Sequence, residues 1–193
     1  IFEDDPYADI RFRGEPLPSM LSLDRHDVVV HASSFTKTVC PGVRVGYLVG
    51  PPELIAGIAK RATNLYISPG MVAQAIVHQF CVSGRIESSI RTVRQALAER
   101  SRALADALRA HIPGVRFTEP DGGYFLWVEL PEDVHVERLV PAAAVRGVAV
   151  VKGSDFLLDG GQHALRLAFS AVTVDRIEEG VRRLADAVQA VRG

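Results

Sequence analysis

Residues 33–47 read SSFTKTVCPGVRVGY, and this stretch determines the fold that we expect. One lysine, Lys37, lies in a short polar segment. The apolar run VVVHA (residues 28–32) precedes it, and the run VRVGYLVG (residues 43–50) follows it. Continuous runs rich in β-branched residues are typical of strands buried on both faces, as in a parallel sheet. The stretch therefore predicts two buried strands with a lysine in the loop between them.

The residue types around Lys37 leave several interpretations open. Ser34 and Arg44 could join the lysine in binding an anion, because arginine forms fork-like hydrogen bonds to phosphate and a hydroxyl adds another. A lysine at the end of a buried strand could also form a Schiff base with an aldehyde. The ordinary alternative is a solvated loop lysine beside an arginine in a strand-end salt bridge. Spacing alone does not decide between these interpretations.

The composition is that of a globular protein. Apolar residues make up 48% of the 193-residue chain, and the net charge is −1, with 22 basic and 23 acidic residues. This balance gives no reason to expect nucleic acid or a membrane as a partner. Two cysteines, Cys40 and Cys81, are too few for a disulfide framework, which favours a cytoplasmic location. The six histidines show no metal-ligand spacing, so no metal is predicted.

Apolar periodicity and Pro/Gly punctuation predict five helices and several strands. The helices are expected over residues 52–65, 70–82, 86–111, 136–145 and 174–191. VRFTEP and GGYFLWVEL are expected to form a hairpin, and VAVVKG and ALRLAFS are expected to form short strands. Residues 1–92 then form part of an α/β layer, and residues 93–193 form a small α+β domain.

The stretch around Lys37 resembles the lysine segment of the class I/II aminotransferases, which are fold-type I enzymes that use pyridoxal 5'-phosphate (PLP). Their motif, S-x-[ST]-K followed by P-G-x-R-x-G-Y, is matched from Ser34 to Tyr47. Three other segments are similar to family motifs in the family's order: EDDPYADIRF, EPDGGYFLWVEL and ALRLAFS. The resemblance covers essentially the whole chain and is greatest to the subgroup of aminoadipate, kynurenine and aromatic or branched-chain aminotransferases.

The resemblance implies a role for six residues. Lys37 would form the Schiff base with PLP and then move the proton between the substrate Cα and the cofactor. Asp4 would pair with the pyridine nitrogen, and Tyr7 would hydrogen-bond the phenolic oxygen. Ser34 and Arg44 would bind the phosphate. Arg166, in the strand ALRLAFS, would bind the substrate α-carboxylate. Tyr124 and Trp127 in the hairpin fit either core packing or a place near the substrate.

The resemblance also implies the wider architecture and function. The fold would be α/β: part of a PLP-binding large domain with a mainly parallel sheet, followed by a C-terminal α+β small domain. Because Ile1 and Phe2 resemble the end of a buried strand and the family pattern begins earlier, we expect the chain to be the C-terminal half of a longer protein. The expected function is transfer of an amino group from an L-amino acid to a 2-oxo acid by a homodimer.

Three alternatives remain open from the sequence. The first is another PLP reaction on the same fold, such as β-elimination. The second is the PLP-binding effector domain of a winged-helix transcription regulator, although that subgroup favours EDDY, without the proline that Pro6 places in EDDPY. The third is an inactive remnant. The residues named above are intact, which argues against the third.

Overall fold

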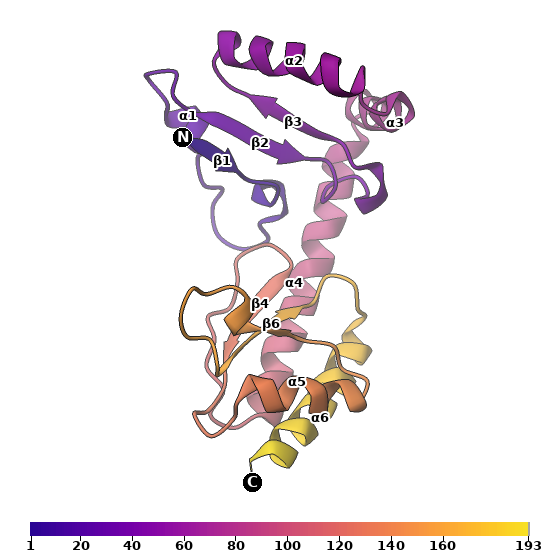
Figure 1. The fold of residues 1–193 in the computed structure, drawn as a ribbon. Coiled ribbons are helices and arrows are strands. Elements are labelled where there is room, and N and C mark those ends of the chain that lie inside the picture. The colour runs from indigo at the N-terminus through magenta and orange to yellow at the C-terminus, as the bar shows by residue number, and fades with distance from the viewer. Residues whose placement is uncertain (193) are drawn as a thin grey trace. The chain divides into compact units, whose positions relative to one another are not determined.

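The computed structural model describes residues 1–192 (Figure 1). The chain divides into two compact units. The first comprises Ile1–Arg94 and the second begins at Gln95. The boundary lies within a single long helix, α4 (Arg85–His111). Each unit has its own three-stranded sheet, and each is described separately below.

The sheet of the first unit contains β1 (Phe2–Asp4), β2 (Val30–Ser34) and β3 (Gly46–Val49), in the order β1-β2-β3. Strands β1 and β2 are parallel, whereas β2 and β3 are antiparallel. The prediction that the run at residues 43–49 lies in a parallel sheet, buried on both faces, is therefore wrong. The connection between β2 and β3 is a short loop, which joins antiparallel neighbours, whereas parallel neighbours need a long crossover. All four residues of β3 are exposed in this chain.

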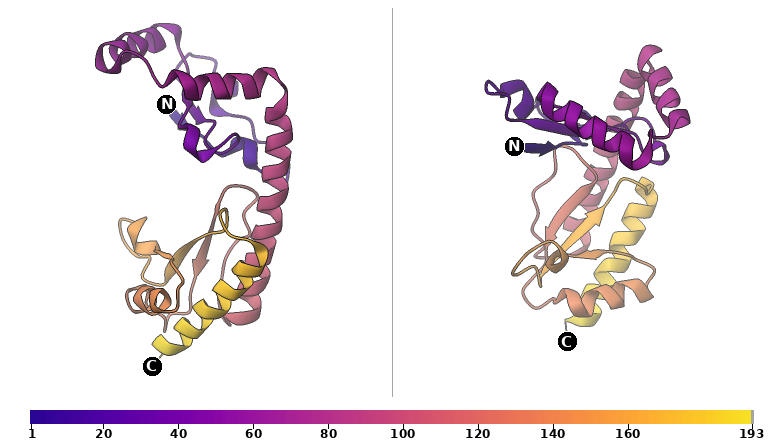
Figure 2. Two further views of the ribbon diagram at one scale, coloured as in Figure 1. Left: turned by 90° about the vertical axis from the view of Figure 1, so that its right-hand side faces the viewer. Right: turned by 45° about the horizontal axis from the view of Figure 1, so that its top comes forward.

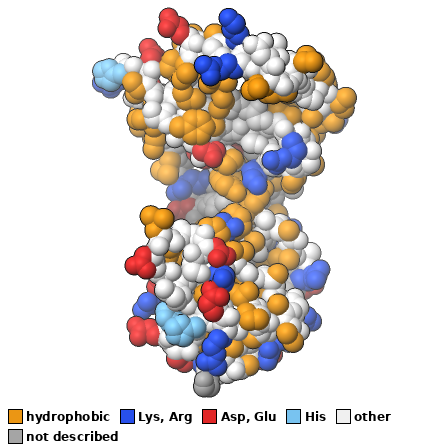
Figure 3. Space-filling view, viewed as in Figure 1, with side chains coloured by type: hydrophobic (Ala, Val, Ile, Leu, Met, Phe, Trp, Pro, Cys, Tyr) orange, Lys and Arg blue, Asp and Glu red, His pale blue; other side chains and the backbone are white. Residues whose placement is uncertain are grey.

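Two further helices follow β3 in the first unit. They are α2 (Pro52–Tyr66) and α3 (Met71–Val82), and both agree with the sequence prediction to within one residue. Pro51 and Pro52 begin α2, where proline has no N–H to leave unpaired. No residue of α2 is buried, and large apolar side chains are exposed on both helices (Figure 3). Leu65, Ile67 and Val72 are each about four-fifths exposed, at 83%, 83% and 77%.

The segment between β1 and β2 is fastened to the sheet by two carboxylates, which the sequence analysis did not identify. Glu3 on β1 accepts hydrogen bonds from the backbone N–H of Met20 at 2.7 Å and of Leu21 at 3.2 Å, at the start of the four-residue helix α1 (Met20–Leu23). Its Oε2 also lies 2.8 Å from His31 Nδ1 on β2. Asp24 accepts three backbone N–H groups, from residues 26, 28 and 29, just before β2 begins.

Because these carboxylates accept hydrogen bonds in the folded chain, we predict that acid destabilises the folded protein. The Met20 amide and then His31 and Leu21 lower the pKa of Glu3, and the amides around Asp24 lower the pKa of its carboxyl. Both carboxyl groups have a lower pKa in the folded chain than in the unfolded chain. The ionised carboxylates therefore stabilise the fold above the usual carboxyl pKa of about 4, and this stabilisation is lost as the pH falls through the folded-state pKa. Urea unfolding at pH 7 and at about pH 2.5, below the usual carboxyl pKa of about 4, should show a smaller pH effect for Asp24→Asn than for the wild type. An unchanged pH effect would contradict the prediction.

The second unit contains an antiparallel sheet in the order β4-β6-β5. Its strands are β4 (Phe125–Glu129), β5 (Val151–Lys152) and β6 (Ala164–Ala168). The predicted hairpin between VRFTEP and GGYFLWVEL is only partly correct. Residues 115–120 contribute a single bridge, Arg116 to Glu129, and the main partner of β4 is the later strand β6. The apolar pattern alone could not show that β6 occupies this position.

Helices α5 (Val136–Val145) and α6 (Val174–Val191) complete the second unit, as predicted. Figure 2 shows α6 alongside the C-terminal part of α4, and Leu104 of α4, Leu167 of β6 and Leu184 of α6 line one cavity. Pro141 lies inside α5 and is exposed, so its ring faces away from the core. The buried stripe of α4 is confined to its second half; its members are Leu97, Ser101, Leu104, Ala105, Ala107 and Leu108.

The remaining elements are three 3₁₀ turns, namely Ala8–Ile10, Pro41–Val43 and Gly153–Asp155. None of the helices described over residues 1–192 combines the length and the apolar character that crossing a membrane requires.

Candidate active site

Lys37 lies in the loop that joins β2 to β3. The two ends of this loop are tied together, because Phe35 N–H donates to the Val45 carbonyl at 3.0 Å. Val39 N–H donates to the Phe35 carbonyl at 2.9 Å, which forms one helical turn around the lysine. The flanking Thr36 and Thr38 are buried, whereas Lys37 is half-buried. Two anchored threonines therefore fix the backbone on either side of an accessible amine.

Tyr7 lies beside this amine. The Lys37 Nζ atom is 5.5 Å from the centroid of the Tyr7 ring. Asp5 holds the backbone that carries the tyrosine, since its Oδ1 accepts the N–H groups of Tyr7 at 3.2 Å and Ala8 at 2.9 Å. Asp4 is the last residue of β1 and is exposed. The two adjacent aspartates thus differ: Asp5 stabilises a turn, while the Asp4 carboxylate remains accessible at the strand end.

A cluster of hydroxyl groups and one guanidinium lies at the base of the Lys37 loop. Ser34 Oγ is 2.6 Å from Thr36 Oγ1 and also accepts the N–H of Thr36 at 3.0 Å. Arg44 Nη1 lies 3.5 Å from the same Thr36 Oγ1. Ser34, Thr36 and Arg44 therefore form one connected group, which we call the hydroxyl–arginine cluster. A cation beside two hydroxyls suits an anion with several oxygens, such as a phosphate.

Arg44 reaches this cluster through an uncommon backbone conformation. Its φ and ψ are 51° and 39°, in the left-handed region, where a residue other than glycine costs about 1 kcal/mol or more. The preceding 3₁₀ turn, Pro41–Val43, ends at this residue. The surrounding loop holds Arg44 in a strained conformation, as is common for residues that bind ligands.

Thr36 is a member of the site that the sequence analysis did not assign. It appears there only as a matched motif position, yet it is the residue through which Ser34 and Arg44 are linked. Its burial, at 7% exposure, together with its polar side chain marks it as a candidate. Spacing gave no such signal, because the link depends on the left-handed turn at Arg44.

Arg166 belongs to the second unit. It is on the central strand β6, directly opposite Trp127 of β4 and Val151 of β5. Its neighbours Leu165 and Leu167 are buried on the other face of the sheet. The guanidinium carbon is 4.2 Å from the ring centroid of Phe125 and 4.0 Å from that of Phe156. Trp127 therefore shares the face of Arg166 and is not part of the buried core.

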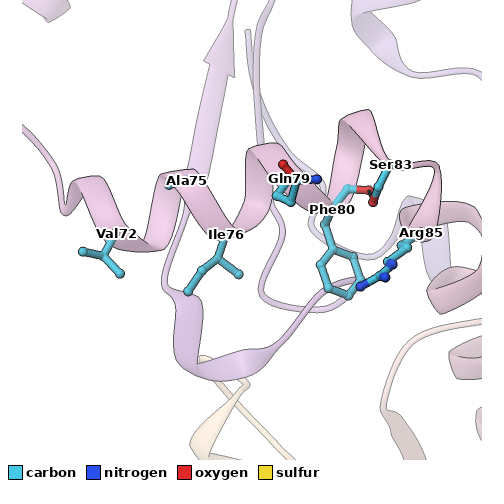
Figure 4. A pocket seen from close by; sticks show the side chains of 7 residues that line it. All are labelled: Val72, Ala75, Ile76, Gln79, Phe80, Ser83 and Arg85. Carbon is cyan, nitrogen blue, oxygen red and sulfur yellow. Dashed lines mark hydrogen bonds between the residues drawn. The ribbon is translucent and has the colours of Figure 1, made fainter.

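Other hollows in the first unit lack reactive groups. A shallow groove of about 450 Å³ runs along α3 and is lined by Val72, Ala75, Ile76, Gln79 and Ser83, with Phe80 and Arg85 side by side at one end (Figure 4). A second, of about 480 Å³, lies between α2 and the strands β2 and β3. Among residues 1–192, no group of three or more His, Cys, Asp and Glu side chains is arranged to hold a metal ion. The chemistry of the first unit is therefore concentrated around Lys37.

The sequence that carries the Lys37 loop and the hydroxyl–arginine cluster matches a known protein family. The model of the family "Aminotransferase class I and II" matches residues 1–184. The chain therefore belongs to the class I and II aminotransferase family, and the fold-type I architecture expected from the sequence is confirmed. The family predicted from the Lys37 motif is likewise confirmed.

Individual members of the family show which aminotransferases and regulators this chain is similar to. The 2-aminoadipate transaminase of Thermus thermophilus is 34% identical over 98% of this chain and 49% of its own length. The crystal structure of Pyrococcus horikoshii kynurenine aminotransferase, which holds PMP, superimposes with a TM-score of 0.91 at 32% identity, over 98% of this chain and 47% of that one. The probable rhizopine catabolism regulatory protein MocR of Rhizobium meliloti is 30% identical over 99% of this chain and 39% of its own length. The chain spans about half the length, or less, of these relatives.

Proposed function

We propose that the protein is a PLP-dependent aminotransferase that moves an amino group from an L-amino acid to a 2-oxo acid. The observation that carries this proposal is the hydroxyl–arginine cluster in the loop that carries Lys37, together with the Tyr7 ring 5.5 Å from the lysine amine. The cluster suits the phosphate of PLP, and the lysine suits its aldehyde. When bound, PLP supplies an aldehyde that condenses with amines and a ring that withdraws electrons from the amino acid Cα.

Each residue then has a defined task. Lys37 would hold the cofactor through its amine and, once released, would carry the proton to and from the substrate Cα. Asp4, at the exposed end of β1, would accept the N–H of the pyridine ring. The Tyr7 hydroxyl would donate to the phenolic oxygen. Ser34 and Arg44 would bind the phosphate, and Arg166 would bind the α-carboxylate as a fork. The first unit is then part of the PLP-binding domain, and the second, from Gln95 onward, is the small domain.

The proposal is tested by reducing the bond between PLP and lysine, so that the labelled lysine can be identified. The full-length protein is incubated with PLP, reduced with borohydride and digested, and pyridoxyl adducts are located by mass spectrometry. Residues 1–193 contain three lysines whose labelling can be compared in one digest, namely Lys37, Lys60 on α2 and Lys152 on β5. Glu137 raises the pKa of Lys152 through a hydrogen bond at 2.9 Å, so a smaller fraction of this amine is neutral and able to attack an aldehyde.

An adduct confined to Lys37 and absent from Lys37→Ala is the expected result. Lys60→Ala and Lys152→Ala are matched controls and should leave the adduct in place. Equal labelling of all three lysines would show that Lys37 has no special environment for the cofactor.

Thr36→Val should weaken PLP binding. Valine has nearly the shape of threonine but lacks the hydroxyl that connects Ser34 to Arg44. Losing one hydrogen bond within a site for a charged group costs about 1.5–3 kcal/mol, which corresponds to roughly a 10- to 150-fold rise in the PLP dissociation constant. The affinity is measured by PLP absorbance titration. Thr36→Ser keeps the hydroxyl and should bind PLP almost as the wild type does; equal loss in both variants would show that the hydroxyl is not the cause.

A second candidate function is a PLP-responsive effector domain of a transcription regulator. The identity with MocR over 99% of this chain favours it. The two functions are separated by two measurements on the full-length protein: turnover of an amino acid with a 2-oxo acid, and retention of double-stranded DNA in a gel-shift assay. Turnover without DNA retention is the result expected from the main proposal.

A further inference from the structure

Arg166 is clamped between two aromatic rings. The guanidinium carbon lies 4.2 Å from the Phe125 centroid and 4.0 Å from the Phe156 centroid, both within the range of a strong cation–π contact. Phe125 comes from β4, and Phe156 directly follows the turn Gly153–Asp155. Two segments that are far apart in the sequence thus meet at one side chain.

The polar contacts of Arg166 do not explain its position. Its Nε atom is buried and has no hydrogen-bond partner in the described chain. Within the second unit as far as residue 192, no carboxylate is ion-paired with it either. A buried guanidinium N–H without an acceptor is destabilising. The rings therefore hold the cation where the unit itself supplies no anion, which leaves its charge available to a ligand.

Burial in the core does not explain why Phe156 lies against Arg166. Its side chain is 44% exposed, and the residues after it, Leu157 and Leu158, are exposed as well. Trp127 supports it in an edge-to-face contact, with ring centroids 6.2 Å apart and planes at 80°. An exposed aromatic ring that rests on a cation is better explained by what it does to the cation than by burial of its own surface.

We propose that Phe125 and Phe156 are positioning residues that fix the plane of the Arg166 guanidinium for a substrate carboxylate. With two aromatic rings 4.0 and 4.2 Å from the guanidinium carbon and with Nε buried, the terminal Nη groups are the part left to bind. An arginine normally loses side-chain entropy when it is immobilised, and the clamp removes this cost from the binding step. Identifying the carboxylate as that of an amino acid or 2-oxo acid rests on the proposed aminotransferase function.

The test uses the full-length holoenzyme and the probe 3-phenylpropanoate, a carboxylate that lacks an amino group and cannot be turned over. Its dissociation constant is measured by calorimetry, alongside KM and kcat for an amino acid. Phe156→Leu should raise the probe dissociation constant and KM about tenfold, the size of a partly desolvated cation–π contact, with kcat within about twofold of the wild type. Phe156→Tyr keeps the ring and should restore wild-type binding. Leu158→Ala, in the same exposed segment, should change neither constant.

The outcomes separate this proposal from the proposed function. If Arg166→Lys loses the probe while Phe156→Leu binds it as the wild type does, the arginine binds carboxylates without a clamp, and the proposal is overturned. If Arg166→Lys also retains the probe, Arg166 is not the carboxylate site, and the proposal is again overturned. If the wild type turns over no amino acid yet binds the probe through Arg166 and Phe156, the aminotransferase proposal fails and the clamp stands.

Discussion

Replacing Lys37 by alanine should abolish transamination. The side chain is expected both to hold the cofactor and to move the proton at the substrate Cα, and proton transfer alone contributes up to about 10⁴-fold to a rate. A fall in kcat of at least about 10⁴-fold is therefore expected, measured as 2-oxo acid formed from an amino acid at saturating PLP. Because Lys37 is half-buried between Thr36 and Thr38, whose burial anchors the loop, the substitution should leave the fold intact.

Two controls make this result specific. Lys37→Arg keeps the positive charge but supplies no amine that can form the linkage, so it should be as inactive as Lys37→Ala. Added ethylamine should restore part of the activity of Lys37→Ala, since a small amine can take over the proton transfer. A Lys37→Ala protein with wild-type turnover would remove the lysine from the mechanism altogether.

The largest effect on stability should come from Leu165→Ala. Leu165 lies on the central strand β6, is fully buried at 0% exposure and is paired with Val128 on one side and Lys152 on the other. Truncating a buried leucine leaves a cavity and costs about 2–5 kcal/mol of unfolding free energy. Urea unfolding measures this loss. Leu158→Ala removes the same atoms from a fully exposed position and should change the unfolding free energy by less than about 0.5 kcal/mol.

A comparable loss in both leucine variants would mean that the second unit is not stabilised by the core around β6. The comparison also bears on Arg166, the next residue along β6. If the strand itself loosens in Leu165→Ala, binding of 3-phenylpropanoate should weaken along with stability, whereas Leu158→Ala should affect neither.

The long helices could be predicted from the sequence because their signal is local. Apolar residues recur every three or four positions in α4 and α6, and proline or glycine marks the ends of α2 and α3. The bounds of α5 were predicted despite Pro141, which lies on the exposed side of the helix. Such patterns report which face of a helix is buried without reference to the rest of the chain.

Strand partners were harder to predict because pairing is not local. Alternating residues in β4 predict a strand but do not identify β6 as its neighbour. The four-residue helix α1 was not predicted, because Glu3 on the distant strand β1 binds the backbone N–H groups at its start. These features depend on contacts between residues that are distant in the sequence.

The candidate site shows the same division. Ser34, Lys37 and Arg44 fall within one motif, so the resemblance identified them, and the hydrogen bonds support the grouping of Ser34 with Arg44 through Thr36. Phe156 was not identified from the sequence, because its role depends on contact with Arg166, which lies on the later strand β6. The roles of Asp4, Tyr7 and Arg166 stay predictions until the trapping and binding experiments are done.

The connection between β2 and β3 has a consequence for the order in which the protein folds. The hairpin needs only the loop of residues 35–45 to close, whereas β1 must reach β2 across residues 5–29. Contacts between residues close in sequence generally form earlier than distant ones. The hydroxyl–arginine cluster, held entirely within the hairpin, should therefore assemble before β1 brings Asp4 and Tyr7 to it. In pulse-labelling hydrogen exchange during refolding, the amide of Phe35 should be protected before the amide of Asp5, which bonds Ala32 across the parallel pair.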